Sequence, residues 1–290
     1  MEDTTKKAVY IKPKTKITPF SIVNTIVFIL ISIIILIPIW KVLVDSLDAA
    51  AGYGMRLWPA KFTFGGYKMI LSRVDLYRPF LISVGVTLAG TLVGLILSTL
   101  GAYVLIQWDM PGRNLFSWLL LFTMLFSGGM IPTYVVMMNL HLTNTLWVVI
   151  LFPALNVYNL VLMRNFFEGI PASLYESATL DGCSPMQTFL RIVLPMSKAA
   201  LASIGLMFAV SYWNDYTHYK LYILDSKLYN FQMKLRGMVM GSDLPTVGGN
   251  ATENTIKNAA IVIVIIPFMI LYPMLQKYFV KGVNIGAVKE

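Results

Sequence analysis

Residues able to do nucleophilic, metal-binding or acid–base chemistry are few in this chain and lie far apart. The only cysteine, Cys183, excludes an intrachain disulfide and a cysteine-rich metal site. The two histidines, His141 and His218, are distant in the sequence, and we expect neither to pair with a carboxylate. The chain also lacks a P-loop motif. The sequence therefore predicts a non-catalytic protein without a metal or cofactor, which does not itself hydrolyse a nucleotide.

Neutral polar and aromatic side chains interrupt two of the apolar segments. Amides hydrogen-bond hydroxyl groups and aromatic rings stack on the apolar faces of sugars, so such a set suits an uncharged, hydroxyl-rich solute. The same side chains could instead join neighbouring helices or form an interfacial aromatic belt. The candidate translocation path consists of Asn156, Tyr158, Asn159, Tyr212, Trp213 and Asn214.

The polar segment 168–198 begins with a helix-start signal. Ser173 is followed three residues later by Glu176, which is the pattern of a capping box, and Pro171 precedes it. This helix is expected to end at Gly182, because glycine readily adopts the left-handed conformation that terminates helices.

A second helix-start signal follows directly. Ser184 is a good N-cap, Pro185 suits the first helical position, and Gln187 stands at the third. Pro195 is expected to interrupt this second helix. The segment therefore predicts two short helices at an angle around a glycine hinge, which together form a rigid projection that can fit a groove on a partner.

The same residues closely resemble the EAA loop of ABC-importer permeases. In that family Glu-Ala-Ala is followed after three residues by glycine, and after nine more by Ile-x-Leu-Pro. This chain matches the spacing without a gap, with Ser177 in place of the middle alanine and Cys183 in place of the alanine that often follows the glycine. The resemblance implies contact with ATPase subunits through Glu176, Ser177, Ala178, Asp181, Gly182, Ile192, Leu194 and Pro195.

Residues 126–134 and 272–289 extend the resemblance to carbohydrate permeases of the maltose-transporter class. More narrowly, they resemble the branch associated with complex-polysaccharide and uronate-oligosaccharide uptake. The resemblance implies a bacterial cytoplasmic-membrane importer of oligosaccharides. This chain would pair with a second, different permease subunit, two ATPase subunits and an extracytoplasmic solute-binding protein.

Two further segments gain roles from the resemblance. The turn-rich stretch 241–250 is expected to reach into the cleft of the binding protein, through Gly241, Asp243, Pro245, Gly248 and Gly249. The tail 282–290 is expected to insert between the ATPase subunits and to become ordered only in the assembled transporter. On residue type alone, these segments would be a solvated connector and a frayed chain end.

Composition places all these residues in a membrane protein. Hydrophobic residues make up 57% of the chain and charged residues only 13%, and the mean hydropathy is +0.69. Soluble domains carry about 25% charged residues, so a soluble or disordered protein is close to excluded. The net charge of +9 comes from Lys and Arg between apolar runs. This arrangement favours contact with the anionic headgroups of a lipid bilayer over nucleic-acid binding.

The apolar runs predict an all-α protein with six membrane-spanning helices, because a span needs about 20 largely apolar residues. The predicted spans are residues 20–44, 80–106, 117–138, 145–163, 199–214 and 259–276. The fifth is short, and we expect its helix to continue through Asp215 toward Leu221.

An even number of spans places both termini on one side of the membrane. Lys and Arg divide almost evenly between the two sides, but five lysines precede the first span and favour a cytoplasmic N-terminus. The expected organisation is a cytoplasmic tail over residues 1–19, a permease domain over 20–281 with the two-helix cytoplasmic loop between spans four and five, and a cytoplasmic tail over 282–290.

Two other classes of protein remain as alternatives. A secondary transporter or channel acting alone would be expected to contain an inverted repeat or ionisable groups near the membrane midplane, and the predicted spans contain almost none. A membrane-bound enzyme would need catalytic groups within the spans. The permease subunit of an ABC sugar importer is the preferred interpretation.

Overall fold

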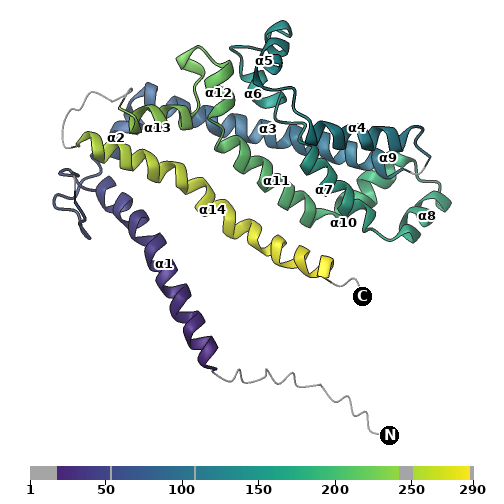
Figure 1. Cartoon of the computed structure of the whole chain (residues 1–290), viewed down its shortest axis with the longest axis horizontal. Coiled ribbons are helices and arrows are strands. Elements are labelled where there is room, and N and C mark those ends of the chain that lie inside the picture. Colours follow the sequence, from purple (N-terminus) through teal and green to yellow (C-terminus); the bar gives the residue numbers. More distant parts are fainter. Residues whose placement is uncertain (1–17, 53, 108, 242–250, 288–290) are drawn as a thin grey trace.

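The computed structural model describes residues 18–52, 54–107, 109–241 and 251–287, the last of these (274–287) as helical backbone only, and its described part is helical apart from one isolated bridge between Asp48 and Phe62. Three long helices dominate the fold (Figure 1): α1 (Pro19–Ser46), α3 (Val74–Ile106) and α14 (Glu253–Ala287). Within the described ranges, these are the helices long and apolar enough to cross a membrane.

Two bent pairs of helices raise the number of candidate crossings to five. α4 (Arg113–Leu125) and α5 (Met130–Asn139) meet at 116°. The helical stretch Pro185–Met196 meets α11 (Lys198–Trp213) at 81°. The predicted helical membrane protein is therefore confirmed, whereas six separate crossings stay a prediction.

The remaining elements are short. They are α2 (Gly65–Ser72), α6 (Leu146–Leu151), α7 (Val157–Glu168), α8 (Ala172–Leu180), α9 (Pro185–Thr188), the π-turn η1 (Phe189–Val193), α10 (Leu194–Met196), α12 (Thr217–Tyr222), the 3₁₀ turn η2 (Ser226–Leu228) and α13 (Phe231–Val239).

Two expectations about continuous helices were wrong. Residues 145–163 form α6 and α7 with a break between them, because Pro153 lacks an N–H and Asn156 starts a new helix by accepting the Asn159 N–H at 3.0 Å. The helix over 199–214 does not continue toward Leu221. It ends at Trp213, and the Asp215 carboxylate accepts the His218 N–H at 3.1 Å, which favours a separate turn.

Glycines of α3 allow α11 to pack closely against it. A Cβ at Gly90 would lie 2.4 Å from Cζ of Tyr212, and one at Gly94 would lie 2.8 Å from Cε1 of Phe208. Each glycine therefore makes room for an aromatic ring, as small residues do at helix interfaces in membranes. The Tyr212 hydroxyl also donates to the Ile150 carbonyl at 2.7 Å, so the same ring joins α11 to α6.

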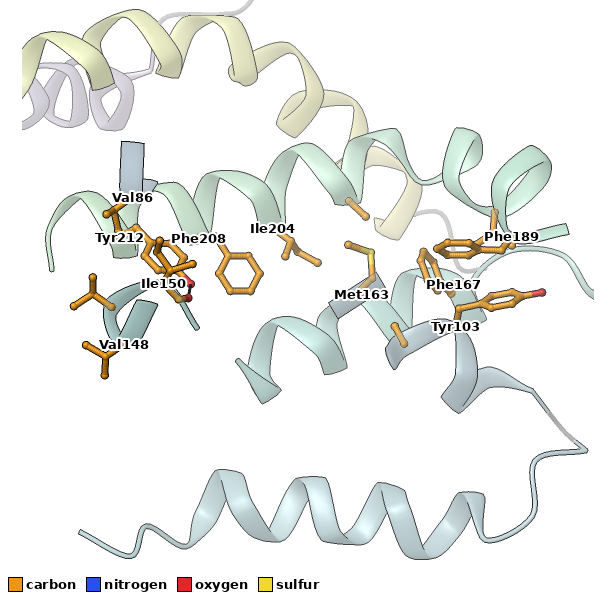
Figure 2. Packing of buried hydrophobic residues seen from close by; sticks show 14 of the residues in the cluster. Val86, Tyr103, Val148, Ile150, Met163, Phe167, Phe189, Ile204, Phe208 and Tyr212 are labelled. Atoms are coloured by element: carbon orange, nitrogen blue, oxygen red, sulfur yellow. Dashed lines mark hydrogen bonds between the residues drawn. The ribbon is translucent and has the colours of Figure 1, made fainter. Parts of the chain in front are cut away.

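The main core follows α11 along its length (Figure 2). Tyr212, Phe208 and Ile204 of α11 are buried, and the series continues through Met163 and Phe167 of α7. One continuous apolar core therefore joins the α6 end of this bundle to the α8–α10 end.

Helix α14 is held by α11 and by α2. The indole Nε1 of Trp213 donates to the Val264 carbonyl at 3.2 Å, which joins α11 to α14. A Cβ at Gly66 in α2 would lie 2.9 Å from the Thr255 carbonyl oxygen, so α2 also lies very close to α14.

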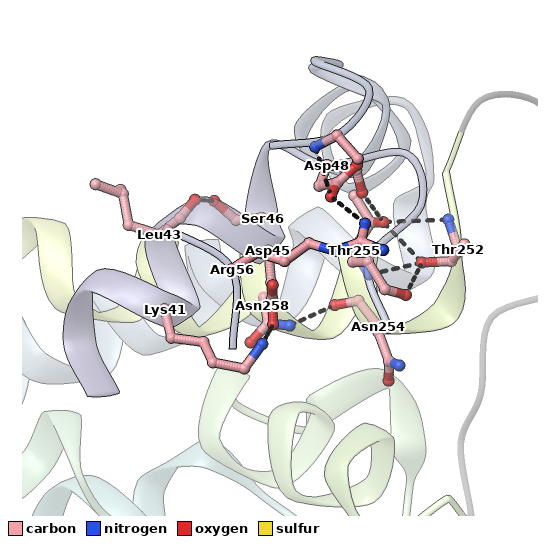
Figure 3. A network of polar contacts seen from close by, with 12 residues as sticks. Lys41, Leu43, Asp45, Ser46, Asp48, Arg56, Thr252, Asn254, Thr255 and Asn258 are labelled. Atoms are coloured by element: carbon pink, nitrogen blue, oxygen red, sulfur yellow. Dashed lines mark hydrogen bonds and ion pairs between the residues drawn. The ribbon is translucent and has the colours of Figure 1, made fainter. Parts of the chain in front are cut away.

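A buried carboxylate organises the connection between α1 and α2 (Figure 3). Oδ1 of Asp48 accepts the N–H groups of Ala50 and Lys61, both at 2.9 Å, and Oδ2 accepts that of Ala60 at 3.0 Å. The Thr255 hydroxyl donates to the Asp48 carbonyl at 2.6 Å. The carboxylate thus joins the two ends of the connection, and the Thr255 bond attaches the connection to the first turn of α14.

Helix α1 diverges from the bundle and packs against α14 (Figure 1). Its residues 19–40 are all exposed, although most of them are apolar. Such a surface is stable only against lipid or another apolar helix.

Candidate functional site

The α8–α10 segment projects from the end of the molecule opposite α2 and α13 (Figure 1). Helix α8 begins at Ala172, two residues before the start expected from Ser173 as N-cap, with Pro171 as N-cap and without a side-chain cap. Ser173 is thus inside the helix and its predicted capping box with Glu176 is wrong. Ser173 instead accepts the Ser177 hydroxyl on its carbonyl at 2.8 Å, and the Glu176 side chain is exposed.

Gly182 ends α8 as predicted. Its φ of +74° is in the left-handed region, where glycine carries no steric penalty. The Cys183 N–H bonds the Ala178 carbonyl at 2.9 Å and the Gly182 N–H bonds the Thr179 carbonyl at 3.0 Å. These two bonds form a Schellman motif, which satisfies the last carbonyls of α8 and defines the direction of the chain that follows.

The second helix starts as predicted but ends differently. Ser184 and Gln187 form a reciprocal capping box, with Ser184 N–H donating to the Gln187 side chain at 2.8 Å. Pro195 does not interrupt the helix. The π-turn η1 precedes it, with the Leu194 N–H bonding the Phe189 carbonyl, and the helix ends at Met196. The helical stretch then bends by 81° into α11, and the bend lies at Ser197, just after Pro195.

The segment is anchored to the bundle by polar contacts. The Tyr175 hydroxyl of α8 donates to the Phe167 carbonyl at 3.3 Å. Burial, and to a smaller extent the neighbouring Tyr103, raises the pKa of Tyr175 to about 12, so this hydroxyl remains a donor at neutral pH. Glu168 at the end of α7 pairs with Arg164 at 2.9 Å and with Arg113 at 3.6 Å.

A pocket of 580 Å³ lies between α8 and the ends of α3 and α7. Its walls include Gln107, Arg113, Glu168, Tyr175 and Glu176. Both carboxylates of this wall are exposed, and Glu168 already pairs with two arginines, so Glu176 is the one that a basic group of a partner could approach.

The residues expected to contact ATPase subunits do not share one face. Ala178 is only 3% exposed and packs inward, and Ile192 and Leu194 are half-buried. The exposed members are Glu176, Ser177, Asp181, Gly182 and Pro195.

Sequence reasoning missed the most exposed apolar side chains of this segment. Leu180 is 89% exposed at the tip of α8, while Met186 and Leu190 are 56% and 54% exposed on the following helix. Single exposed apolar side chains are normal on a protein surface, but a group of them on a projecting segment is unusual. The signal available in the sequence was the position of Leu180, two residues before the helix-ending Gly182. The segment therefore presents a rigid apolar tip flanked by carboxylates.

The six predicted path residues fall into two groups. The Tyr212 and Trp213 rings are buried, and their polar atoms already bond the backbones of α6 and α14. Asn159 is also buried, at 4% exposure. Asn156, Tyr158 and Asn214 are exposed, although the Asn156 side chain caps α7. The second group is thus exposed in the single chain, whereas the first group is used for packing.

Further polar residues gather beyond the end of α11. Asn214 accepts a hydrogen bond from Gln232 of α13 at 3.3 Å, and the guanidinium of Arg236 lies 4.3 Å from the centre of the Tyr216 ring. Gln232 and Arg236 were missed because α12 and η2 separate their helix from α11 in the sequence, and helix pairing is not visible there.

His218 corrects another expectation. Its Nδ1 lies 3.0 Å from both carboxylate oxygens of Asp215, so this histidine does have a carboxylate partner. The pair is three residues apart, and the same carboxylate accepts the backbone N–H of His218. His218 also stacks on Tyr222, with an interplanar angle of 7°. Of the predicted binding-protein loop, Gly241 is described with a φ of +77°, and Asp243, Pro245, Gly248 and Gly249 lie outside the described residues.

The chain is similar to known permease proteins along most of its length. The chain is 44% identical over 240 residues to the polygalacturonan/rhamnogalacturonan transport system permease protein YtcP of Bacillus subtilis (strain 168), covering 80% of this chain and 84% of that protein. It is 40% identical over 279 residues to Protein LplC of the same organism, covering 93% of this chain and 95% of that protein.

A solved structure shows the same fold. It is the crystal structure of a bacterial ABC transporter involved in the import of the acidic polysaccharide alginate, and one of its chains matches with a TM-score of 0.84 and 31% identity, over 90% of this chain and 96% of that one. Residues 90–285 match the family described as binding-protein-dependent transport system inner membrane component. The chain is a multi-pass membrane protein and belongs to this family of inner membrane permease components.

Proposed function

We propose that this chain is one of two different permease subunits in an ATP-driven, binding-protein-dependent oligosaccharide importer of the bacterial cytoplasmic membrane. Two ATPase subunits on the cytoplasmic side and an extracytoplasmic solute-binding protein complete the assembly. The similarity to permease proteins along most of the chain supports this function over a transporter acting alone. Hydrolysis of ATP then belongs to the partner subunits.

The α8–α10 segment carries the proposal. Its Schellman motif at Gly182 and its capping box at Ser184 satisfy the helix ends internally, so the segment keeps its shape without a partner. Its apolar tip at Leu180 and the exposed carboxylate of Glu176 then suit a groove with apolar walls and a basic rim. We propose that this segment docks on an ATPase subunit and couples hydrolysis to transport.

The proposed topology has six crossings and both termini in the cytoplasm. The crossings are made by α1, α3, α4 with α5, α6 with α7, α11 and α14. The segments that connect α1 to α3 and α11 to α14 then lie outside, and the α8–α10 segment lies inside. The opposite positions of α2 and α8 in the fold support this assignment (Figure 1).

Two further proposals, about the chain ends and about residues 241–250, accompany this topology. Residues 1–19 and 282–290 form cytoplasmic tails of a permease domain over 20–281, and the second tail senses closure of the ATPase dimer. Residues 241–250 contact the solute-binding protein through Gly241 and the residues that follow it.

The proposed substrates are oligosaccharides that contain uronate units. Relatives named for polygalacturonan/rhamnogalacturonan transport and for alginate import support this class. The exposed amide of Asn214 and the guanidinium of Arg236 lie at one end of α11, where hydroxyls and carboxylates could be bound in turn.

The test is reconstitution of the whole transporter. The chain, its second permease, the ATPase and the binding protein should co-purify and take up labelled oligogalacturonate in ATP-containing proteoliposomes. Neutral arabino-oligosaccharides of equal length serve as the matched panel. Uptake by this chain alone, without ATPase, would favour a stand-alone transporter. Preference for the neutral panel would contradict the uronate assignment only.

A further inference from the structure

The last turns of α3 contact the α9–α10 helix at two places. Tyr103 is 8% exposed, and its hydroxyl donates to the Pro185 carbonyl at 2.9 Å, across 82 residues of sequence. Its ring also lies 4.9 Å from that of Phe189, at an interplanar angle of 40°. Figure 2 shows Tyr103 beside Phe189 and Phe167 at the end of the core.

The Pro185 carbonyl is an unusually well-defined acceptor. Pro185 is the first residue of α9, and the Ser184 capping box holds it in place. Its oxygen also accepts the Phe189 N–H, and a carbonyl has a second lone pair for the Tyr103 hydroxyl. Tyr103 contacts Pro185, the first residue of the helix, and Phe189, the first residue of its π-turn. Two points of attachment prevent the helix from rotating about either one.

The two arms of the α8–α10 segment are held by different helices of the bundle. Helix α8 is attached to α7, through Tyr175 and Phe167. The α9–α10 helix is attached to α3, through Tyr103. Gly90 and Gly94 of the same α3 lie directly against rings of α11, so displacement of α3 must displace α11.

We infer that Tyr103 is a positioning residue of the transport cycle, which fastens the α9–α10 helix to α3 and so carries movement of the projecting segment into the membrane-spanning helices. The inference rests on the proposed coupling role of that segment. Tyr103 acts through the helix that it holds and is not itself a contact of the ATPase or the sugar.

Tyr103→Phe in the assembled transporter tests the inference, because it removes one hydroxyl and keeps the ring. A net hydrogen bond lost here raises the population of the detached helix about fivefold. ATPase activity should still be stimulated by the binding protein, while sugar transported per ATP hydrolysed falls several-fold. Amide exchange of residues 189–196, measured by mass spectrometry of the complex, should rise about fivefold.

Tyr77→Phe is the matched control, since Tyr77 is at the other end of α3 and its hydroxyl makes no hydrogen bond within the described residues. It should change neither quantity. Unchanged transport per ATP and unchanged exchange in Tyr103→Phe would overturn the inference. If Tyr103→Phe failed to co-purify with the ATPase, Phe189→Leu is tested instead, because it removes the contact with the Tyr103 ring and keeps an apolar side chain in the core. The same falls in coupling and protection are expected, and unchanged values would overturn the inference.

A second variant separates this inference from the function on which it rests. Glu176→Ala alters the exposed side of α8 and leaves the Tyr103 contact in place. Uncoupling by Glu176→Ala but not by Tyr103→Phe would reject the fastening role alone. Normal coupling in both variants would reject the coupling role of the whole segment.

Discussion

Gly182 shows how one residue determines the shape of the projecting segment. A Cβ added there would meet no atom within 4 Å, so the space around it is open. The requirement for glycine comes from its φ of +74°, because other L-residues pay about 1–2 kcal/mol in the left-handed region. A bulky side chain at this position therefore acts through backbone strain and not by pushing the second helix away.

Substitution of Gly182 should follow this conformational ranking. Gly182→Ala and Gly182→Leu should both weaken the Schellman motif by about 1 kcal/mol and reduce transport per ATP, whereas Gly182→Asn should retain more coupling because asparagine tolerates φ > 0. Transport and ATPase assays on the purified complex provide the measurement. Equal activity in all three variants and the native protein would show that the turn does not need this geometry.

Asp48 is a second residue with a wider effect, because the pKa of its carboxyl makes the stability of the protein depend on pH. Burial raises the pKa of its carboxyl, but the N–H groups of Ala60, Ala50 and Lys61 and the guanidinium of Arg56 lower it by more. The net pKa is below the ordinary value. A carboxyl whose folded pKa is depressed stabilises the protein above its unfolded pKa of about 3.9, and this contribution is lost as the pH falls through the folded value.

The contribution of Asp48 to thermal stability in detergent should therefore be constant from neutral pH to about pH 5. It should decline below about pH 4. Asp48→Asn should be less stable at neutral pH by about 1–3 kcal/mol, because an amide nitrogen cannot accept the backbone N–H groups, and it should lose that decline. Thermal unfolding of both proteins across this range measures the difference. An Asp48→Asn variant with native stability at pH 7 would contradict the assignment.

At the scale of elements, the pairing of α3 with α11 depends on two glycines that face aromatic rings. The Tyr212 ring cannot easily retreat from Gly90, because its hydroxyl is bonded to the Ile150 carbonyl. A methyl group at Gly90 must therefore move a helix and not only a side chain.

Gly90→Ala should lower the stability of the chain by about 1–3 kcal/mol through overpacking. Gly85→Ala on the same helix is the control, since a Cβ there meets nothing within 4 Å, and it should be neutral or stabilising by up to about 1 kcal/mol. Thermal unfolding in detergent distinguishes the two. Equal effects of both substitutions would mean that the helices do not pack as described.

Local signals predicted several of these elements well, and tertiary contacts explain the failures. Ser184, Gln187 and Gly182 determine their turns through bonds to nearby backbone, so their roles were visible in the sequence. The break between α6 and α7 was missed because an apolar run around Pro153 still satisfies a hydropathy window. The proximity of Tyr103 to Pro185, and of Gln232 to Asn214, depends on helix pairing that no local pattern encodes.

At the scale of the whole molecule, one apolar core connects an accessible polar region near Asn214 with a projecting tip at Leu180. This arrangement lets a displacement at one end reach the other through packed side chains. The tip itself remains 89% exposed in the single chain, so its burial must come from another subunit if the proposed assembly forms.

Leu180→Asp should therefore disrupt assembly. Burial of a leucine side chain contributes about 1.5–3 kcal/mol, so association with the ATPase should weaken about tenfold or more. Leu57→Asp is the control, because Leu57 is 64% exposed in the connection between α1 and α2, away from the proposed docking surface. Co-purification with the ATPase measures both variants. Native association in Leu180→Asp would exclude the tip from the interface.

The bond between Thr255 and Asp48 also sets an order of events during biosynthesis. Its two residues are 207 positions apart, so α1 enters the membrane long before its fastening partner leaves the ribosome. Until α14 is inserted, the Asp48 connection lacks its anchor, and the first helix lacks the long helix against which it packs in the described structure. A chain that ends before α14 therefore leaves the apolar surface of the first helix without this partner, and only completion of the last helix covers it.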